Sequence, residues 1–320
     1  MTLRLGTRGS QLALVQANAV AALLRDRAGV DCDIVVIKTS GDRMSNVPLA
    51  EAGGKRLFVK EIEDALLAGE IDLAVHSSKD LPTILPDGLA IGAVLPREDA
   101  RDAIVLPAGH GPTSFEDLAA RLGNRPRIGT SSVRRSAQLA RALPGATFVA
   151  VRGNLDTRLT KLADGGYDAL VLASAGLIRL GHRDRISVPL PIQSCIPAPG
   201  QGIVAVEIRH GDDRMSWTDV VTDRAAHAAF DAERAVVTRL GGGCQMPLGA
   251  FAEVYADVIS VVATVLSLDG RVALRAESRG PVTAAMDVGH TVADALTAQG
   301  ADRLLADVGR TQAETGGLRS

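Results

Sequence analysis

The chain has few aromatic residues and few cysteines. Tryptophan, tyrosine and phenylalanine make up 2% of its 320 residues, whereas 46% are hydrophobic. Its cores must therefore be packed mainly from aliphatic side chains. Cys32, Cys195 and Cys244 are too few and too far apart for a disulfide framework or a zinc site, and the six histidines show no ligand spacing. We expect no metal.

Strong charge and long apolar runs are also missing. The net charge is −2, which argues against a nucleic-acid-binding protein, because such domains are usually basic. No stretch reaches the 18 or so apolar residues of a membrane span. The N-terminal residues lack the basic segment and cleavage site of a secretory signal. We therefore expect a cytoplasmic protein without a membrane partner.

Short apolar strands alternate with amphipathic helices over the first two thirds of the chain, which predicts an α/β fold. Strands are expected at 3–6, 34–38, 71–75 and 203–208, and helices at 10–27, 57–68 and 133–143. Residues 225–298 instead predict a small α+β part, with three alternating strands between two helices. Only a short element at 303–308 follows, and we expect residues 310–320 to be disordered.

Two sequence patterns occur twice, in the same order. Residues 4–13 resemble 127–140, and Gly-x-x-Asp-x-x-Val-x-x-Ser-x-x-Leu at 69–81 recurs at 165–177. Chance similarity is one explanation. Two similar α/β domains that face a shared cleft are a simpler one.

Residues 127–135 predict an anion site. A strand ends at Gly129, a polar turn follows, and a helix begins near Val133. Backbone N–H groups and the helix dipole at such a place favour a negative charge. Arg134 and Arg135 could reach the same ligand, although two solvated arginines are the alternative.

More arginines follow the ends of other strands, where α/β proteins bind their ligands. They are Arg8, Arg152, Arg158 and Arg179. Arginine pairs with carboxylates and phosphates through bidentate hydrogen bonds. The cluster therefore suits a polyanion better than a single small anion, although each arginine alone could be a solvated surface residue.

Asp80 and Cys244 could carry chemistry. Asp80 is an acidic residue among cations and could transfer protons or stabilise a developing cation, although a helix cap or an ion pair with Lys79 is the alternative. Cys244 follows three glycines and could be a nucleophile or an attachment point, although an inert buried thiol is the alternative. We interpret His76 as a buried, hydrogen-bonded histidine, and Cys32 and Cys195 as structural.

Seven motifs in order resemble the porphobilinogen deaminase (hydroxymethylbilane synthase) family. The resemblance runs from about Leu3 to Val308. The motifs are Gly6-Thr7-Arg8-x-Ser10, Gly53-Gly54-Lys55-x-Leu57-Phe58, His76-Ser77-x-Lys79-Asp80, Gly129-Thr130-Ser131-Ser132-x-Arg134-Arg135, Arg152-Gly153-Asn154, Pro197-Ala198-x-Gly200-Gln201-Gly202 and Gly242-Gly243-Cys244-Gln245.

The resemblance implies two similar domains of the type II periplasmic-binding-protein kind and a small C-terminal α+β domain. The expected bounds are 1–96 with 200–217 for the first domain, including a flap at 42–56, then 97–199, 218–309 and a tail at 310–320. It implies a monomeric transferase of haem and tetrapyrrole biosynthesis. This enzyme would deaminate four porphobilinogen molecules, join them head to tail on a dipyrromethane, and release hydroxymethylbilane.

The resemblance also implies roles for individual residues. Cys244 would hold the dipyrromethane through a thioether, and Asp80 would bind pyrrole N–H groups, stabilise the azafulvenium cation and move protons. The other expected cofactor-binding residues are Lys79, Ser10, Thr130, Ser131, Ser132, Arg134, Arg135, Arg158 and Gly153. The expected substrate-binding residues are Arg8, Ser10, Arg152, Arg158 and Arg179.

Three residues depart from the family pattern. Glu51 stands where some members have a basic flap residue, Gly241 replaces a glutamate, and Met246 replaces a smaller β-branched residue. They put the flap charge and the packing of the cysteine loop in doubt. Two other functions compete: a clamshell binding module for a small polyanion, and a cysteine-dependent hydrolase or acyltransferase. Neither explains the whole set of motifs, because the first gives Cys244 no role and the second lacks a paired histidine.

Overall fold

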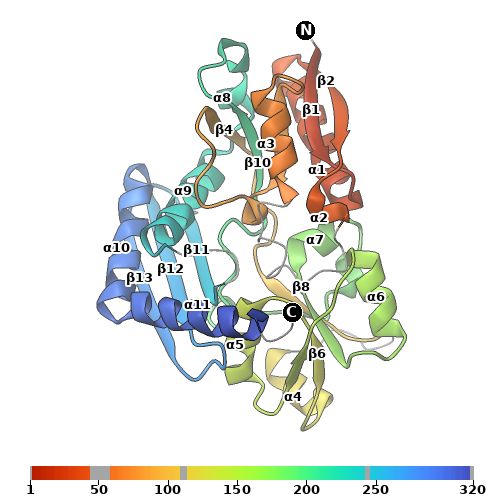
Figure 1. The fold of residues 1–320 in the computed structure, drawn as a ribbon, viewed down its shortest axis with the longest axis vertical. Coiled ribbons are helices and arrows are strands. Elements are labelled where there is room, and N and C mark those ends of the chain that lie inside the picture. Colours follow the sequence, from red (N-terminus) through yellow and green to blue (C-terminus); the bar gives the residue numbers. More distant parts are fainter. Residues whose placement is uncertain (1, 44–57, 109–113, 242–245, 318–320) are drawn as a thin grey trace.

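Three separate sheets organise the chain in the computed structural model (Figure 1). The structure describes residues 2–43, 58–108, 114–241 and 246–317. Two sheets have five strands each and the third has three. The α/β class, with two similar halves and a C-terminal α+β part, is confirmed. No helix in these described ranges is long and apolar enough to cross a membrane.

The first sheet has the strand order β2-β1-β3-β10-β4. Its strands are β1 (Thr2–Arg8), β2 (Asp31–Ile37), β3 (Leu73–Ser77), β4 (Leu89–Val94) and β10 (Val204–Arg209). β1 pairs in parallel with β2 and β3, while β10 pairs antiparallel with β3 and β4. The late strand β10 thus returns to the first sheet, as its sequence predicted.

The second sheet repeats this order as β7-β6-β8-β5-β9. Its strands are β5 (Asp102–Val105), β6 (Arg127–Gly129), β7 (Thr147–Val149), β8 (Ala169–Ala173) and β9 (Val188–Pro189). β6 is parallel to β7 and β8, and β5 is antiparallel to β8 and β9. β6 therefore corresponds to β1, and β5 corresponds to β10.

The repeated sequence patterns form the same contact in both sheets. In the first, the Arg4 backbone N–H donates to the Asp72 carboxylate at 2.8 Å, and the Asp72 N–H donates to the Arg4 carbonyl at 2.8 Å. In the second, Arg127 and Asp168 make the same reciprocal bonds at 2.7 and 2.9 Å. The echoes therefore mark equivalent positions, which a chance similarity would not explain.

Helices join and cover these strands. They are α1 (Gln11–Ala28), α2 (Ser40–Arg43), α3 (Lys60–Leu67), α4 (Phe115–Leu122), α5 (Val133–Ala142), α6 (Leu155–Ala163), α7 (Ser174–Arg179) and α8 (Thr218–Val221). Ser10 caps α1 by accepting a hydrogen bond from the Ala13 N–H, as predicted. The expected helix at 57–68 is shorter at both ends, as α3. Most of the expected flap, residues 44–56, lies outside the described residues.

The C-terminal part combines three helices with an antiparallel sheet. Its strands are β11 (Leu248–Tyr255), β12 (Val258–Leu266) and β13 (Ala273–Pro281), and its helices are α9 (Arg224–Arg239), α10 (Ala285–Ala298) and α11 (Ala301–Gly317). Aliphatic side chains of α9 and α10, such as Val236 and Val292, pack against the strands as one core.

Helix α11 continues through residues 310–317 to Gly317, where the sequence predicted a disordered tail. Residues 312–314 read Gln-Ala-Glu, which are good helix formers and extend an existing helix without a new nucleation step. Residues 318–320 lie outside the described part of the chain. The domain bounds themselves stay a prediction.

Candidate functional site

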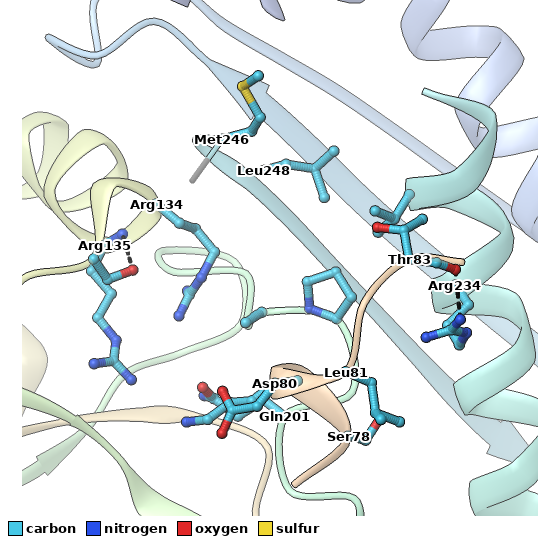
Figure 2. Close-up of a pocket in the computed structure, with 15 residues that line it drawn as sticks. Ser78, Asp80, Leu81, Thr83, Arg134, Arg135, Gln201, Arg234, Met246 and Leu248 are labelled. Atoms are coloured by element: carbon cyan, nitrogen blue, oxygen red, sulfur yellow. Dashed lines mark hydrogen bonds between the residues drawn. The ribbon is translucent and has the colours of Figure 1, made fainter. Parts of the chain in front are cut away.

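A cavity of about 210 Å³ opens where the three parts of the chain meet. The turn after β3, the start of α5, the segment 198–201, helix α9 and strand β11 all contribute to its wall (Figure 2). The wall consists of Ser78, Lys79, Asp80, Leu81, Thr83, Ser132, Arg134, Arg135, Ala198, Pro199, Gln201, Arg234, Val237, Met246 and Leu248. The wall therefore combines cations and hydrogen-bonding groups with apolar side chains such as Leu81, Val237 and Leu248.

Asp80 lies at the boundary between this cavity and a smaller one. β3 ends at Ser77, and a single 3₁₀ turn, Ser78–Asp80, follows. The smaller cavity, of about 60 Å³, has a wall made of Arg8, Ser10, Leu12, Ala13, Gln16, Phe58, Val59, Val75, His76, Ser77 and Asp80. Asp80 is the residue that both walls share. A ligand in either cavity can therefore approach this carboxylate.

Arg134 and Arg135 are buried, which excludes the solvated alternative. Their side chains share Asp102, the first residue of β5. Arg134 Nη1 donates to Asp102 Oδ2 at 2.7 Å, and Arg135 donates to Oδ1 through Nε at 2.9 Å and Nη2 at 2.7 Å. The helix that carries both arginines begins at the N-cap Ser132, which accepts a hydrogen bond from the Arg135 N–H.

The charges of this cluster support one another. Burial alone would raise the pKa of Asp102, but the positive charges of Arg134 and Arg135 hold it well below its usual range. Burial likewise opposes the charged form of Arg134, yet the Asp102 charge raises its pKa above the ordinary value. The cluster of one carboxylate and two guanidinium groups keeps a net charge of about +1 at the cavity wall.

The other predicted arginines lie in different surroundings. Arg8 stacks on the Phe58 ring at 4.3 Å in the wall of the smaller cavity. Arg158 donates from Nε to the Gly153 carbonyl, and burial together with the nearby Arg135 charge lowers its pKa, while Asp80 opposes the shift.

Arg179 and Arg152 are in neither wall. Arg179 Nη2 donates to the Gly202 carbonyl at 2.7 Å, and burial lowers its pKa. The Arg152 carbonyl accepts from Lys161. Neither residue is brought into the larger cavity in this conformation.

The predicted small polar residues divide into two groups. Ser10, Lys79 and Ser132 lie in the cavity walls. Ser131 and Thr130 instead hold their own turn: Ser131 Oγ donates to the Val151 carbonyl, and Thr130 Oγ1 accepts from the Ser132 N–H.

The backbone conformation at position 153 requires a glycine. Its φ of 110° is in the left-handed region, and an added Cβ would lie 2.6 Å from Thr157 Cγ2. It precedes Asn154, which caps helix α6.

Three important residues were not predicted. Asp102 is the first residue of the buried strand β5 and has no local signal. Arg234 is in the middle of α9, where its donors reach the carbonyls of Pro82 at 2.9 Å and Thr83 at 2.6 Å. Gln201 was noted only as part of a motif. A search limited to strand ends misses residues that reach the site from other elements.

The predictions for His76 and Cys195 agree with their surroundings. His76 is buried and its Nε2 lies 3.0 Å from Glu207 Oε2. Cys195 is fully buried beside Asp102, and burial raises the pKa of its thiol to about 12. Burial also raises the pKa of Cys32 to about 11. Neither thiol is suited to form a thiolate near neutral pH.

Cys244 lies outside the described residues, as do Glu51 and the cysteine loop at 242–245. The chain resumes at Met246, which lies in the wall of the larger cavity (Figure 2). No group of three or more metal-binding side chains occurs in the part of the chain that the structure describes.

Two family models match the sequence. One, described as "Porphobilinogen deaminase, dipyromethane cofactor binding domain", matches residues 3–217, and the other, "Porphobilinogen deaminase, C-terminal domain", matches residues 228–298. The porphobilinogen deaminase of Geobacter metallireducens is 45% identical over 96% of this chain and 94% of its own length. That of Syntrophotalea carbinolica is 46% identical over 95% of both chains.

Solved structures show a weaker likeness. Substrate binding domain 2 of Lactococcus lactis GlnP has a TM-score of 0.43 at 13% identity and covers 75% of this chain and 90% of its own. The VFT2 domain of Bordetella pertussis BvgS has a TM-score of 0.38 at 20% identity and covers 67% and 84%.

Proposed function

The chain belongs to the porphobilinogen deaminase family, and from this premise we propose that Cys244 carries its dipyrromethane and that Asp80 is its catalytic carboxylate. The protein is a transferase of tetrapyrrole biosynthesis. It deaminates porphobilinogen, joins four of these units head to tail on the covalently bound dipyrromethane, and releases hydroxymethylbilane. The observation that carries the residue assignment is the place of Asp80 in both cavity walls, beside cations in each.

The residues of the larger cavity fit a dipyrromethane. Each pyrrole ring offers one N–H donor, two carboxylates and an apolar face. Lys79, Arg134 and Arg234 supply cations for carboxylates, and Leu81 and Leu248 supply an apolar wall for the rings. The buried amide oxygen of Gln201 has no hydrogen-bond partner in the described structure, so this wall still lacks a donor. A pyrrole N–H is such a donor.

The neighbour of Cys244 in the sequence supports its proposed role. Met246, two residues later, lies in the wall of the larger cavity. Consecutive Cα atoms are about 3.8 Å apart, so a thioether at Cys244 can hold the cofactor beside that wall. When bound, the dipyrromethane supplies the α-carbon to which the first new ring is joined.

Asp80 can carry out the charge and proton chemistry. Its carboxylate accepts a pyrrole N–H and stabilises the positive charge that develops as ammonia leaves the substrate. The same group can take the proton that the attacking ring carbon loses when the new carbon–carbon bond forms. Because Asp80 lies in the walls of both cavities, the same carboxylate can act in each successive addition.

The cationic residues hold the carboxylates of the growing chain. Six rings with two carboxylates each carry about 12 negative charges, which only a cationic site can hold. We assign the larger cavity to the cofactor, with Ser132, Arg134 and Arg135, and the smaller cavity to substrate, with Arg8 and Ser10. Further proposed ligands, which contact rings as the chain lengthens, are Lys79, Thr130, Ser131, Arg152, Gly153, Arg158 and Arg179.

We also propose that the enzyme is a cytoplasmic monomer that acts without nucleic acid or membrane. The modest net charge of −2 supports this proposal. The domains are proposed to be 1–96 with 200–217, 97–199 and 218–309.

The intact mass of the purified protein tests the assignment of Cys244. We expect a mass above that of the sequence by one dipyrromethane, lost together with activity in Cys244→Ser. Cys32→Ser is the matched control and should keep both. An unmodified Cys244 in active wild-type enzyme would contradict the proposal.

A further inference from the structure

Gln201 is almost fully buried in the wall of the larger cavity, with 1% of its surface exposed. Its amide nitrogen donates to the Ala100 carbonyl at 2.7 Å and to Asp102 Oδ1 at 2.9 Å. Gln201 and Asp80 both line the larger cavity (Figure 2). Gln201 is therefore hydrogen-bonded to the Asp102 carboxylate of the arginine cluster and shares a cavity wall with Asp80.

The orientation of this amide is fixed by its two partners. A backbone carbonyl and a carboxylate that is ion-paired to two arginines are both acceptors, so only the NH₂ end of the amide can face them. The Oε1 end must point the other way. This oxygen is buried and has no hydrogen-bond partner in the described part of the chain.

A buried acceptor without a donor is unfavourable, because it has lost its hydrogen bonds to water. The missing partner must be a donor, which excludes the carboxylates of the ligand. Inside the cavity proposed for the cofactor, the pyrrole N–H is the donor on each ring.

We propose that Gln201 Oε1 accepts the N–H of one pyrrole ring of the tethered dipyrromethane. This inference rests on the proposed function of the cavity. A neutral amide fixes the ring without adding negative charge, so Asp80 remains the group that stabilises the developing cation. Gln201 thereby holds the cofactor ring in register with Asp80, on the side of the cavity that Asp102 and the two arginines form.

The test uses the holoenzyme labelled with ¹⁵N at the pyrrole nitrogens alone. In Gln201→Met, which keeps the length of the side chain but has no acceptor oxygen, we expect one of the two pyrrole N–H resonances to move upfield and to exchange faster with solvent. The loss of one neutral hydrogen bond should lower kcat/KM about three- to tenfold. Gln201→Glu, which keeps an acceptor oxygen, should restore the resonance at a pH where its acid is neutral.

Gln138→Met is the matched control. Gln138 is also a buried glutamine, but both ends of its amide are satisfied by Ile196, and it is not in the cavity wall. This variant should leave both N–H resonances unchanged, even if it loses stability. If a folded, cofactor-loaded Gln201→Met variant showed both N–H resonances at their wild-type positions, the inference about Gln201 would be wrong, but the proposed function would stand. If the wild-type protein contained no labelled pyrrole, the proposed function itself would be refuted.

Discussion

Asp80 is the residue on which the chemistry is proposed to depend, and its substitution separates binding from turnover. Asp80→Ala should keep the dipyrromethane, since we propose that Cys244 and the cationic wall hold the cofactor. Loss of a group that moves protons should lower turnover by a factor of about 10² to 10⁴. The measurements are intact mass and the rate of ammonia release.

Asp87→Asn is the control for that experiment, because Asp87 is exposed in the loop that follows Asp80. It should match wild type in mass and rate. Near-normal turnover in a cofactor-loaded Asp80→Ala variant would be incompatible with the proposed role.

The individual site residues were predictable only where the chain itself marks them. Asp80, Ser10 and Ser132 follow strand ends, and their turn chemistry is visible in the sequence. Asp102 is 32 positions from Arg134 and looks like any residue at a strand start, so its ion pairs could not be anticipated. The sequence thus predicted cations near a ligand but not the carboxylate that orients two of them.

At the scale of elements, Asp72 joins strand β1 to the 3₁₀ turn at Asp213–Met215. Its carboxylate accepts from Arg4 of β1 at 2.8 to 3.0 Å and from Arg214 Nη1 at 3.1 Å. Burial acts to raise the pKa of Asp72, but hydrogen bonds from Arg4 and Arg214 lower it to about 2. The corresponding Asp168 is exposed, although it makes the same reciprocal backbone contact.

This pKa predicts a pH-dependent contribution to stability. The folded-state pKa is below the unfolded value of about 3.9, so the contribution is complete above about pH 5 and is lost as the pH falls toward 2. Asp72→Asn should therefore lower the free energy of unfolding by about 2 to 3 kcal/mol at pH 7 and by progressively less below pH 4.

Urea unfolding from pH 7 to pH 2.5 measures this difference, with Asp168→Asn as the control that should change less. A constant gap between wild type and Asp72→Asn across that range would show that the charge of Asp72 is not the cause.

Glu233 of α9 ties the C-terminal part to the segments that connect the two larger sheets. Its Oε1 accepts from Arg97 Nη1 at 2.6 Å and from the Ala252 N–H at 2.7 Å, and its Oε2 accepts from the Gly200 N–H at 2.6 Å. The carboxylate is fully buried. A single side chain thus contacts both connecting segments and strand β11.

Removal of one partner of this buried pair should be costly. Glu233→Ala leaves the Arg97 guanidinium without its counter-charge, and we expect a loss of about 3 to 5 kcal/mol in unfolding free energy. The exposed pair Arg239–Asp294 is the control, since Asp294→Ala should cost no more than about 1 kcal/mol. Equal losses in calorimetry for both variants would contradict this interpretation.

The elements themselves were largely predictable. The period of the apolar residues indicated the α/β alternation, and the repeated patterns indicated two equivalent sheets. Helix α11 was missed because residues 310–317 lack the apolar spacing that marks a packed helix, and only their continuity with the preceding turns makes them helical. A pattern of burial cannot identify the end of a helix that lacks this apolar spacing.

At the scale of the whole molecule, the three parts of the chain each contribute to one cavity. The first sheet brings Asp80, the second brings Arg134 and Arg135, and the C-terminal part brings Arg234 and Met246 (Figure 2). No single part of the chain contains all of these residues. The motifs that carry them occur in all three parts of the sequence. A product that grows by successive rings must be accommodated by motion between parts joined through residues 95–101 and 190–203.

The mass of the enzyme during turnover tests the central claim most directly, namely that an oligopyrrole grows while it is tethered to this cavity. After brief mixing with porphobilinogen, the intact protein should show a ladder of masses, each step one deaminated unit above the last, up to four steps. In Cys244→Ser the ladder should be absent. If wild-type enzyme formed product while its own mass never rose above that of the resting enzyme, the account of a tethered, elongating chain would be wrong.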